Sequence, residues 1–166
     1  MIQISAVSRA VRIAAIITAA LLVAACAKGP GGTDGASLSI AGAAPGTSQD
    51  FTVNVGDRVF FETDSSDFTD VAVATLNKQI TWLRQYGKYH FTVEGHADER
   101  GTREYNIALG ARRAEAVRAY FVAHGIAASR MRTISYGKER PVAVCNDISC
   151  WSQNRRAVIV LENAGV

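Results

Sequence analysis

The chain has 166 residues and a formal net charge of +3, with 48% hydrophobic and 20% charged residues. Residues 1–25 contain two of its 18 Lys and Arg residues and none of its 15 Asp and Glu residues, so the remainder carries a net charge of +1. This balance excludes strong long-range attraction to nucleic acid or anionic lipid, and the length allows one compact domain with a tether.

The chain begins with a segment typical of a bacterial signal peptide. Arg9 and Arg12 precede the apolar run IAAIITAALLVAA, which is too short to span about 30 Å of hydrocarbon. The next residues, LVAA and then Cys26, resemble a lipobox, where diacylglycerol is attached to a cysteine sulfur before the leader is cleaved. We therefore predict a signal peptide over 1–25 and a mature protein anchored by diacylglycerol and N-acyl (palmitate-type) lipid on Cys26. The alternative is an ordinary secretory signal that is cleaved near Cys26.

The segment after Cys26 contains few large apolar residues. Gly, Ser, Ala and Pro dominate residues 27–50, so no hydrophobic core can form there. We predict a lipidated N-terminus and flexible tether over 26–50, with a root-mean-square span on the order of 25–30 Å. The folded domain is predicted over 51–166.

From residue 51 onward the pattern predicts alternating strands and helices. Runs of β-branched and aromatic residues predict strands at 51–55 (FTVNV) and 58–62 (RVFFE), and Thr69 or Asp70 can cap a helix that runs to about Gln85. The later predicted elements are a strand at 89–95, a helix at 103–124 that ends at Gly125, a strand at 130–137 and, after a long loop, a strand at 155–162. This order predicts an α/β (α+β) two-layer sandwich with helices on one face of a mixed sheet.

The long loop contains the two remaining cysteines, Cys145 and Cys150. Since the leader directs the chain to an oxidising compartment, we predict a disulfide between them. The loop that it closes is short, so the stabilisation should be about 2 kcal/mol. The alternative is two free thiols.

Two charged residues stand out in TVEGHADERGTREYNIALGARRAEAV. Arg113 lies four residues after Leu109 and four before Val117, within the apolar stripe of the second predicted helix. A guanidinium there must either extend to the edge of the sheet or meet an anion. Asp98 lies in a Gly-containing loop, where a carboxylate can be a turn residue or a ligand. If both flank one pocket, that pocket suits a small zwitterion.

At these residues the chain resembles the OmpA-like peptidoglycan-binding family and, within it, the lipid-anchored members. The string VEGHADERGTREYNIALGARRAEAV matches the core pattern of the family, SYGKERP matches its next strand and turn, and NRRAV matches its last strand. The resemblance covers about residues 55–160 and implies a β-α-β-α-β-β fold. One departure is Gly110, where many relatives carry Ser.

The resemblance implies non-covalent binding of the peptidoglycan stem peptide through meso-diaminopimelate. In the family, the Asp that matches Asp98 binds the ammonium of that residue, and the Arg that matches Arg113 binds its carboxylate. Substitution of either should abolish wall binding and leave the melting temperature nearly unchanged. Further positions that match ligand contacts are Phe61, Asp64, His96, Asn106, Leu109 and Arg155 or Arg156. Since a strand alternates faces, only one of those two arginines should face the pocket, and the other should be a solvated surface charge.

The resemblance also implies the biological setting. It implies a monomeric, non-enzymatic domain that faces the periplasm, with no metal or other cofactor, on an outer-membrane lipoprotein. Its expected partners are peptidoglycan and the Tol proteins, above all the β-propeller TolB. Through the Tol–Pal system it should support envelope integrity and inward movement of the outer membrane during cell division.

Two other functions compete with this interpretation. His90, His96, His124, Glu94 and Asp98 could suggest a metal-dependent cell-wall hydrolase, but His90 and His96 lie on one strand without a helical ligand pair. A flagellar-motor stator subunit of the same fold would require a membrane-spanning helix, and the leader is too short.

Overall fold

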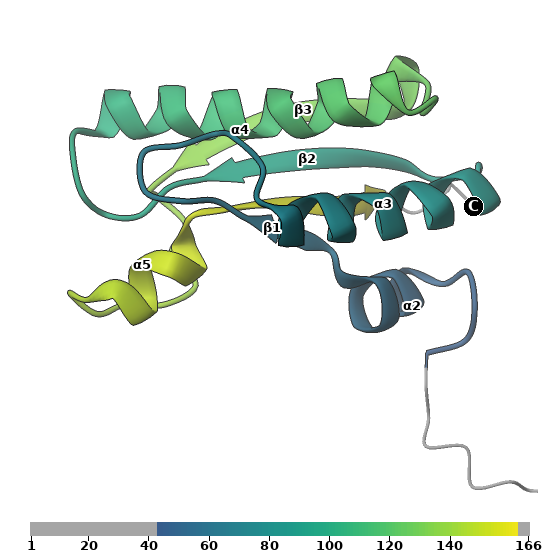
Figure 1. Cartoon of the computed structure of the whole chain (residues 1–166), viewed down its shortest axis with the longest axis horizontal. Helices are drawn as coiled ribbons and strands as arrows, with labels where there is room; N and C mark the ends of the chain where they lie inside the picture. The colour runs from purple at the N-terminus through teal and green to yellow at the C-terminus, as the bar shows by residue number, and fades with distance from the viewer. Residues whose placement is uncertain (1–42, 163–166) are drawn as a thin grey trace, which may run out of the picture. The chain divides into compact units, whose positions relative to one another are not determined.

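The computed structural model describes residues 43–162 (Figure 1). The predicted signal peptide, Cys26 and the tether up to residue 42 lie outside the described residues. In chain order the elements are α2 (Ser48–Asp50), the π-helix η2 (Phe51–Gly56), β1 (Arg58–Phe60), α3 (Asp70–Gln85), β2 (His90–His96), α4 (Arg103–Ala123), the 3-10 helix η3 (Ala128–Arg130), β3 (Met131–Gly137), α5 (Ile148–Asn154) and β4 (Arg156–Glu162).

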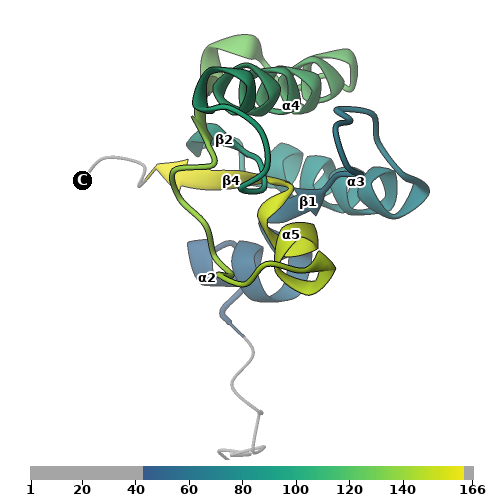
Figure 2. The same ribbon diagram turned by 90° about the vertical axis from the view of Figure 1, so that its left-hand side faces the viewer.

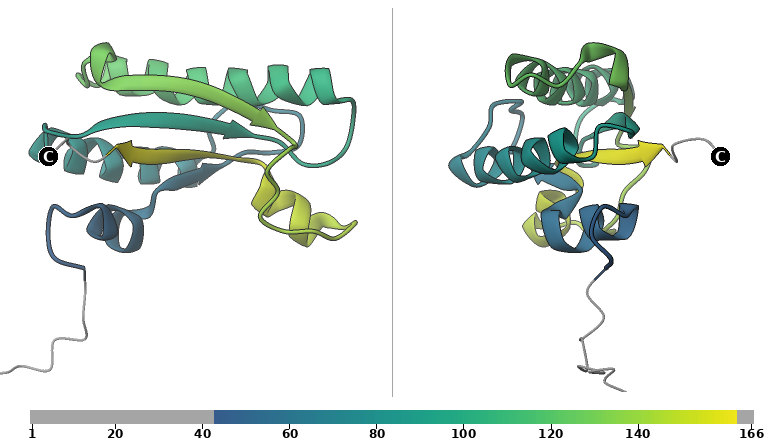
Figure 3. Two further views of the ribbon diagram at one scale, coloured as in Figure 1. Left: turned by 180° about the vertical axis from the view of Figure 1, so that it is seen from behind. Right: turned by 90° about the vertical axis from the view of Figure 1, so that its right-hand side faces the viewer.

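The four strands form one mixed sheet in the order β1-β4-β2-β3. β2 and β3 are parallel, and β4 is antiparallel to both β1 and β2. From behind, the strands lie in front of α3 and α4 (Figure 3, left), so both helices cover the same face. Phe91 and Val93 on β2 point into the core formed there, with Leu76 of α3 and Phe121 of α4. The predicted two-layer sandwich is confirmed.

Both long helices begin at the residues that the sequence favours. Thr69 caps α3 by accepting a hydrogen bond from the Ala72 N–H (3.2 Å), and Thr102 caps α4 in the same way. After α4 the chain turns at Gly125, whose φ of 84° suits a residue without a Cβ. Among residues 43–162, no helix combines the length and apolar composition needed to cross a bilayer.

Helix α4 approaches strand β2 very closely at two glycines. A Cβ on Gly95 would overlap the carbonyl group of Gly110, and a Cβ on Gly110 would meet the Ser135 side chain and the Gly95 carbonyl. Only glycine at both positions permits this backbone contact. The contact brings Arg113, almost one turn after Gly110, over the end of β2.

The prediction of a strand at 51–55 is wrong, because Phe51–Gly56 forms the π-helix η2. In a strand, Phe51, Val53 and Val55 would share a face, but Phe51 is buried and Val53 is 65% exposed. The Phe51 ring packs against the Trp82 ring, with 4.9 Å between centroids. This tertiary contact overrides the local preference of the β-branched residues.

The last part of the predicted tether belongs to the folded domain, so residues 43–50 correct the predicted boundary at Phe51. The Asp50 carboxylate accepts hydrogen bonds from Trp82 Nε1 (2.7 Å) and from the Gly46 N–H (2.8 Å). The Tyr89 hydroxyl donates to the Gly46 carbonyl (2.8 Å). These contacts join a segment without large apolar side chains to the core through hydrogen bonds, which composition alone does not reveal.

The long loop after β3 contains a helix that the sequence pattern did not predict. Asp147 caps α5, where its carboxylate accepts from the Ser149 N–H (2.7 Å). The predicted disulfide between Cys145 and Cys150 is present and closes the loop at the start of this helix. In Figure 2, α5 and α2 lie below the strands, on the side away from α4.

Candidate functional site

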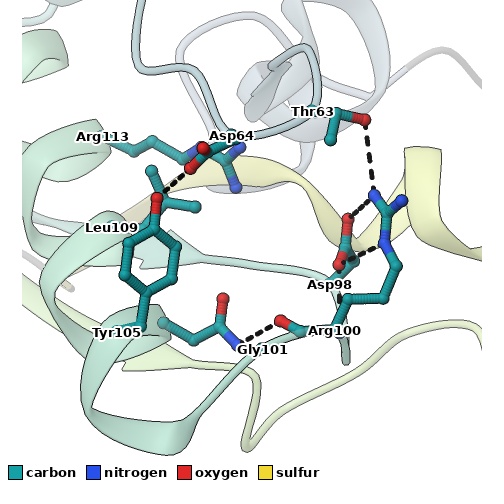
Figure 4. Close-up of a pocket in the computed structure, with 9 residues that line it drawn as sticks. Thr63, Asp64, Asp98, Arg100, Gly101, Tyr105, Leu109 and Arg113 are labelled. Carbon is teal, nitrogen blue, oxygen red and sulfur yellow. Dashed lines mark hydrogen bonds and ion pairs between the residues drawn. The ribbon is translucent and has the colours of Figure 1, made fainter.

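A cavity of about 230 Å³ opens where the loops after β1 and β2 meet the first half of α4 (Figure 4). The residues that line it are Thr63, Asp64, Asp98, Arg100, Gly101, Tyr105, Asn106, Leu109 and Arg113. Asp98 and Arg113 therefore share one cavity, as the sequence pattern suggested. Of the other predicted positions, Asp64, Asn106 and Leu109 also line it.

Arg113 is fully buried and donates to three backbone carbonyls in two segments of the chain. Its Nε donates to the Ser65 carbonyl (2.8 Å), Nη1 donates to the His96 carbonyl (2.7 Å), and Nη2 donates to the Glu62 carbonyl (3.0 Å). The guanidinium also lies 5.1 Å from the centroid of the Phe61 ring. Arg113 thus neither reaches the edge of the sheet nor pairs with a carboxylate; it joins the loop after β1 to the end of β2.

Arg113 keeps its charge and two N–H donors that bind no carbonyl. Burial and the neighbouring charge of Arg155 lower the pKa of Arg113 to about 10, so the group is still a cation near neutral pH. Within residues 43–162, no carboxylate lies within 4.0 Å of its nitrogens. A guanidinium has five N–H donors, and three of them bind carbonyls here. Nη1 and Nη2 each keep a second N–H, which an anion in the cavity can bind.

Asp98 is buried and already holds a cation. Its Oδ1 accepts from Nε (3.0 Å) and from the backbone N–H (3.1 Å) of Arg100, and its Oδ2 accepts from Arg100 Nη2 (2.6 Å). Arg155 Nη1 lies 3.6 Å from Oδ2. Burial raises the pKa of Asp98, but the hydrogen bonds and charge of Arg100, with the charge of Arg155, lower it further, so the net shift is downward. The carboxylate is therefore ionised at neutral pH.

The opposite wall of the cavity contains one more acidic group. The Tyr105 hydroxyl donates to Asp64 Oδ1, and this hydrogen bond raises the pKa of Tyr105 (Figure 4). Asp64 has a φ of 56°, a left-handed conformation that is uncommon outside glycine but that Asn and Asp adopt more often than other residues. Asn106 is buried and donates to the Arg100 carbonyl (2.7 Å), which fixes the loop after Asp98.

The His96 side chain does not line the cavity, so its predicted role as a ligand contact gains no support from the geometry. A bulge between Gly95 and His96 shifts the register of β2, and the buried ring lies beside Tyr136, 5.6 Å between centroids. Burial and then the charges of Arg156, Arg140 and Arg58 lower the pKa of His96 to about 4, so the ring is neutral at pH 7. His96 serves the site only through its carbonyl, which accepts from Arg113.

The two adjacent arginines make different contacts, but strand alternation does not explain this, because only Arg156 lies on β4 and Arg155 is the C-cap of α5. Arg155 Nε donates to the Phe61 carbonyl (2.9 Å), and its Nη1 approaches Asp98. Arg156 is also buried, because the loop after β3 covers it and the Arg140 carbonyl accepts from its Nη2 (3.1 Å). The prediction that the arginine facing away from the pocket is a solvated surface charge is therefore wrong for Arg156. Neither arginine lines the cavity, and Phe61 contacts the Arg113 guanidinium without lining the cavity itself.

Sequence reasoning did not single out four residues of the cavity, which are Thr63, Arg100, Gly101 and Tyr105. Three of them lie in the string DERGTREY, directly after Asp98. Of the four, Arg100 was the easiest to predict from the sequence, since the side chain of an Arg two residues after a loop Asp can fold back onto its carboxylate.

The cavity contains no arrangement typical of a metal centre. Among the described residues, no group of three or more His, Cys, Asp or Glu side chains could hold a metal ion. His90 is exposed on β2, whereas His124 lies at the end of α4, stacked on Tyr120 with 4.1 Å between centroids. The histidines considered for a hydrolase are thus not gathered at one place in residues 43–162.

Comparison with known proteins identifies the family. The family model described as "OmpA family" matches residues 60–155. The peptidoglycan-associated lipoprotein of Rhizobium meliloti (strain 1021) is 61% identical over 156 residues, which cover 93% of this chain and 89% of that protein. The crystal structure of the peptidoglycan-associated lipoprotein from Burkholderia pseudomallei has a TM-score of 0.62 at 42% identity and covers 64% of this chain and 90% of that one.

A more distant likeness concerns the fold alone. The C-terminal domain of Helicobacter pylori MotB has a TM-score of 0.60 at 20% identity, covering 64% of this chain and 84% of that one.

The match to the family model and the 61% identity to the Rhizobium meliloti protein over nearly the whole length point to one group of proteins. The chain belongs to the OmpA family and, within it, to the peptidoglycan-associated lipoproteins.

Proposed function

We propose that this protein is a non-enzymatic clamp that binds the peptidoglycan stem peptide in the cavity between Asp98 and Arg113. The observation that carries the proposal is the pair of buried, opposite charges in one cavity, neither bonded to the other. The names of the relatives, which state an association with peptidoglycan, support the same ligand.

The chemistry of the cavity favours meso-diaminopimelate as the recognised residue. The free end of that residue carries an ammonium and a carboxylate on one carbon atom. The ammonium can bind Asp98, and the carboxylate can accept the two spare N–H groups of Arg113. A stem peptide with lysine at this position lacks the carboxylate and would leave Arg113 without its anion. The site should therefore discriminate strongly between the two types of wall.

The wider role rests on the expected lipid anchor and on family membership. A protein lipidated at Cys26 in the outer membrane, with its domain in the periplasm, would tether that membrane to the wall. We further propose that TolB and other Tol proteins are partners, that TolB competes for the same face, and that the chain supports inward movement of the outer membrane during division. Binding of TolB by the full-length protein and loss of that binding in excess stem peptide would test the competition.

Co-sedimentation with isolated sacculi tests the proposed ligand. We expect Asp98→Asn to abolish co-sedimentation with diaminopimelate-containing sacculi, because the ammonium loses its counter-charge. Asp67→Asn is the matched control, since Asp67 is an exposed loop carboxylate that does not line the cavity, and it should bind like the wild type. Undiminished binding of Asp98→Asn would refute the site. The sacculi should release no soluble muropeptides, with or without added zinc; zinc-dependent release would instead support a hydrolase.

A further inference from the structure

Trp151 of α5 contacts both residues that follow Asp98. The guanidinium of Arg100 lies 4.2 Å from the centroid of the Trp151 ring, within cation–π distance. The Trp151 Nε1–H donates to Glu99 Oε1 (3.1 Å). One side chain from the loop after β3 therefore holds two consecutive residues of the loop after β2.

Arg100 in turn covers the buried carboxylate. Its backbone N–H, Nε and Nη2 all donate to Asp98, and Nη2 also lies 3.3 Å from Thr63 Oγ1 (Figure 4). The Arg100 side chain is 41% exposed. An exposed arginine ordinarily samples many rotamers, so an ion pair at the surface is usually weak. The Trp151 ring restricts that freedom on one side.

The loop that carries Trp151 is itself fixed at two points. The disulfide between Cys145 and Cys150 closes the segment before Trp151. Asn154 then ties the end of α5 to the start of the loop: its Oδ1 accepts from the Val142 N–H (2.8 Å), and its Nδ2 donates to the Ala143 carbonyl (2.7 Å). A helix as short as α5 is marginal by itself, so these links determine where Trp151 lies.

We propose that Trp151 is a positioning residue for the cavity. It holds Arg100 on Asp98, and the disulfide-closed loop holds Trp151. A carboxylate has about four acceptor positions, and Arg100 occupies three of them. The remaining position is on Oδ2, which Arg155 Nη1 approaches to 3.6 Å without a hydrogen bond, and a ligand ammonium can bind there while Arg100 stays in place. The loop after β3 thereby sets the direction of the carboxylate and keeps it ionised.

The first test needs no ligand. The Asp98 carboxyl is titrated by ¹³C NMR in the purified full-length protein, in wild type, Trp151→Ala and Trp151→Phe. We expect the pKa of Asp98 to rise in Trp151→Ala and to stay low in Trp151→Phe, which keeps a ring beneath the guanidinium. The double variant Cys145→Ser/Cys150→Ser should resemble Trp151→Ala. Gln153→Ala, an exposed neighbour on α5, is the control and should leave the pKa unchanged.

A variant of Arg100 shows whether Trp151 acts through it. In an Arg100→Met background, Trp151→Ala should cause no further rise in the pKa of Asp98, because the group that Trp151 positions is already gone. The same Asp98 pKa in wild type and Trp151→Ala would overturn the proposal. An equal rise with and without Arg100 would also overturn it, since Trp151 would then act by another route.

The second test measures affinity and rests on the proposed function. A stem tripeptide that ends in meso-diaminopimelate is titrated into each variant by calorimetry. We expect about fivefold weaker binding by Trp151→Ala and near-normal binding by Trp151→Phe. If the wild type binds no tripeptide, the proposed function fails and the carboxyl titration still decides the role of Trp151. If the wild type binds and Trp151→Ala binds equally well, the positioning role fails.

Discussion

Replacement of Arg113 by Met should destabilise the fold, although Arg113 also lines the candidate cavity. The guanidinium joins the carbonyls of Glu62 and Ser65, in the loop after β1, to the carbonyl of His96 at the end of β2. Methionine keeps most of the apolar stem and removes every donor. The sequence pattern predicted a nearly unchanged melting temperature for this substitution. The three hydrogen bonds instead predict a substantial loss of stability.

The size of the loss follows from where the three carbonyls lie. The hydrogen bond to His96 is buried, so that carbonyl loses its partner without gaining water, at a cost of about 1–3 kcal/mol. The other two hydrogen bonds are partly buried, and water can replace them in part. Removal of a desolvated cation offsets some of the cost. We expect the free energy of unfolding to fall by about 2–4 kcal/mol.

Urea denaturation of the full-length protein measures this change. Arg132→Met is the matched control, because Arg132 is a 78% exposed arginine on β3, and it should change the free energy of unfolding by less than about 0.5 kcal/mol. A change equally small in Arg113→Met would refute the structural role. Loss of ligand binding in Arg113→Met must therefore be interpreted together with Asp98→Asn, which removes no backbone link.

Three further predictions concern the scaffold. Gly95→Ala should lower the melting temperature severely or prevent folding, since the new Cβ would overlap the backbone of α4. Gly87→Ala is the control and should be tolerated, because a Cβ there meets no atom within 4 Å. Equal melting temperatures of the two variants would contradict the close contact between Gly95 and α4. Since the folded-state pKa of His96 is lowered to about 4, folding favours the neutral ring. His96 should therefore contribute stability above about pH 6.5 that is lost as the pH falls toward 4, up to about 3 kcal/mol; an unchanged pH dependence of unfolding in His96→Gln would argue against this. Cys145→Ser/Cys150→Ser should lower the free energy of unfolding by about 2 kcal/mol, which denaturation under non-reducing conditions would measure; a loss above about 4 kcal/mol would show that the loop supports the core.

Local signals in the sequence were sufficient for most of the fold. The helices α3 and α4 begin after Thr69 and Thr102, and their apolar residues recur at helical spacing, so both could be predicted with their bounds. The segment Phe51–Gly56 could not, because its conformation depends on Trp82, a residue distant in the sequence. The folding of residues 43–50 likewise depends on Asp50 and its partners, which composition does not reveal.

The sequence allowed the charged residues of the candidate site to be predicted, but not the contacts that those residues make. Arg113 was recognisable as a misplaced cation in an apolar stripe, and Asp98 as a loop carboxylate. The carbonyls that Arg113 binds come from other parts of the chain, so no periodicity could indicate them. The contact of Arg100 with Trp151 depends on how the loop after β3 folds back. Such long-range contacts are set by packing and not by local pattern.

The central claim is that Asp98 and Arg113 together recognise both charges of meso-diaminopimelate. Calorimetric titration of the full-length protein with two stem tripeptides, one ending in meso-diaminopimelate and one in lysine, tests it most directly. We expect the diaminopimelate peptide to bind and the lysine peptide to bind about 100-fold or more weakly, because the latter leaves Arg113 without an anion. Equal affinity for the two peptides, or undiminished binding of the first by Asp98→Asn, would contradict the claim.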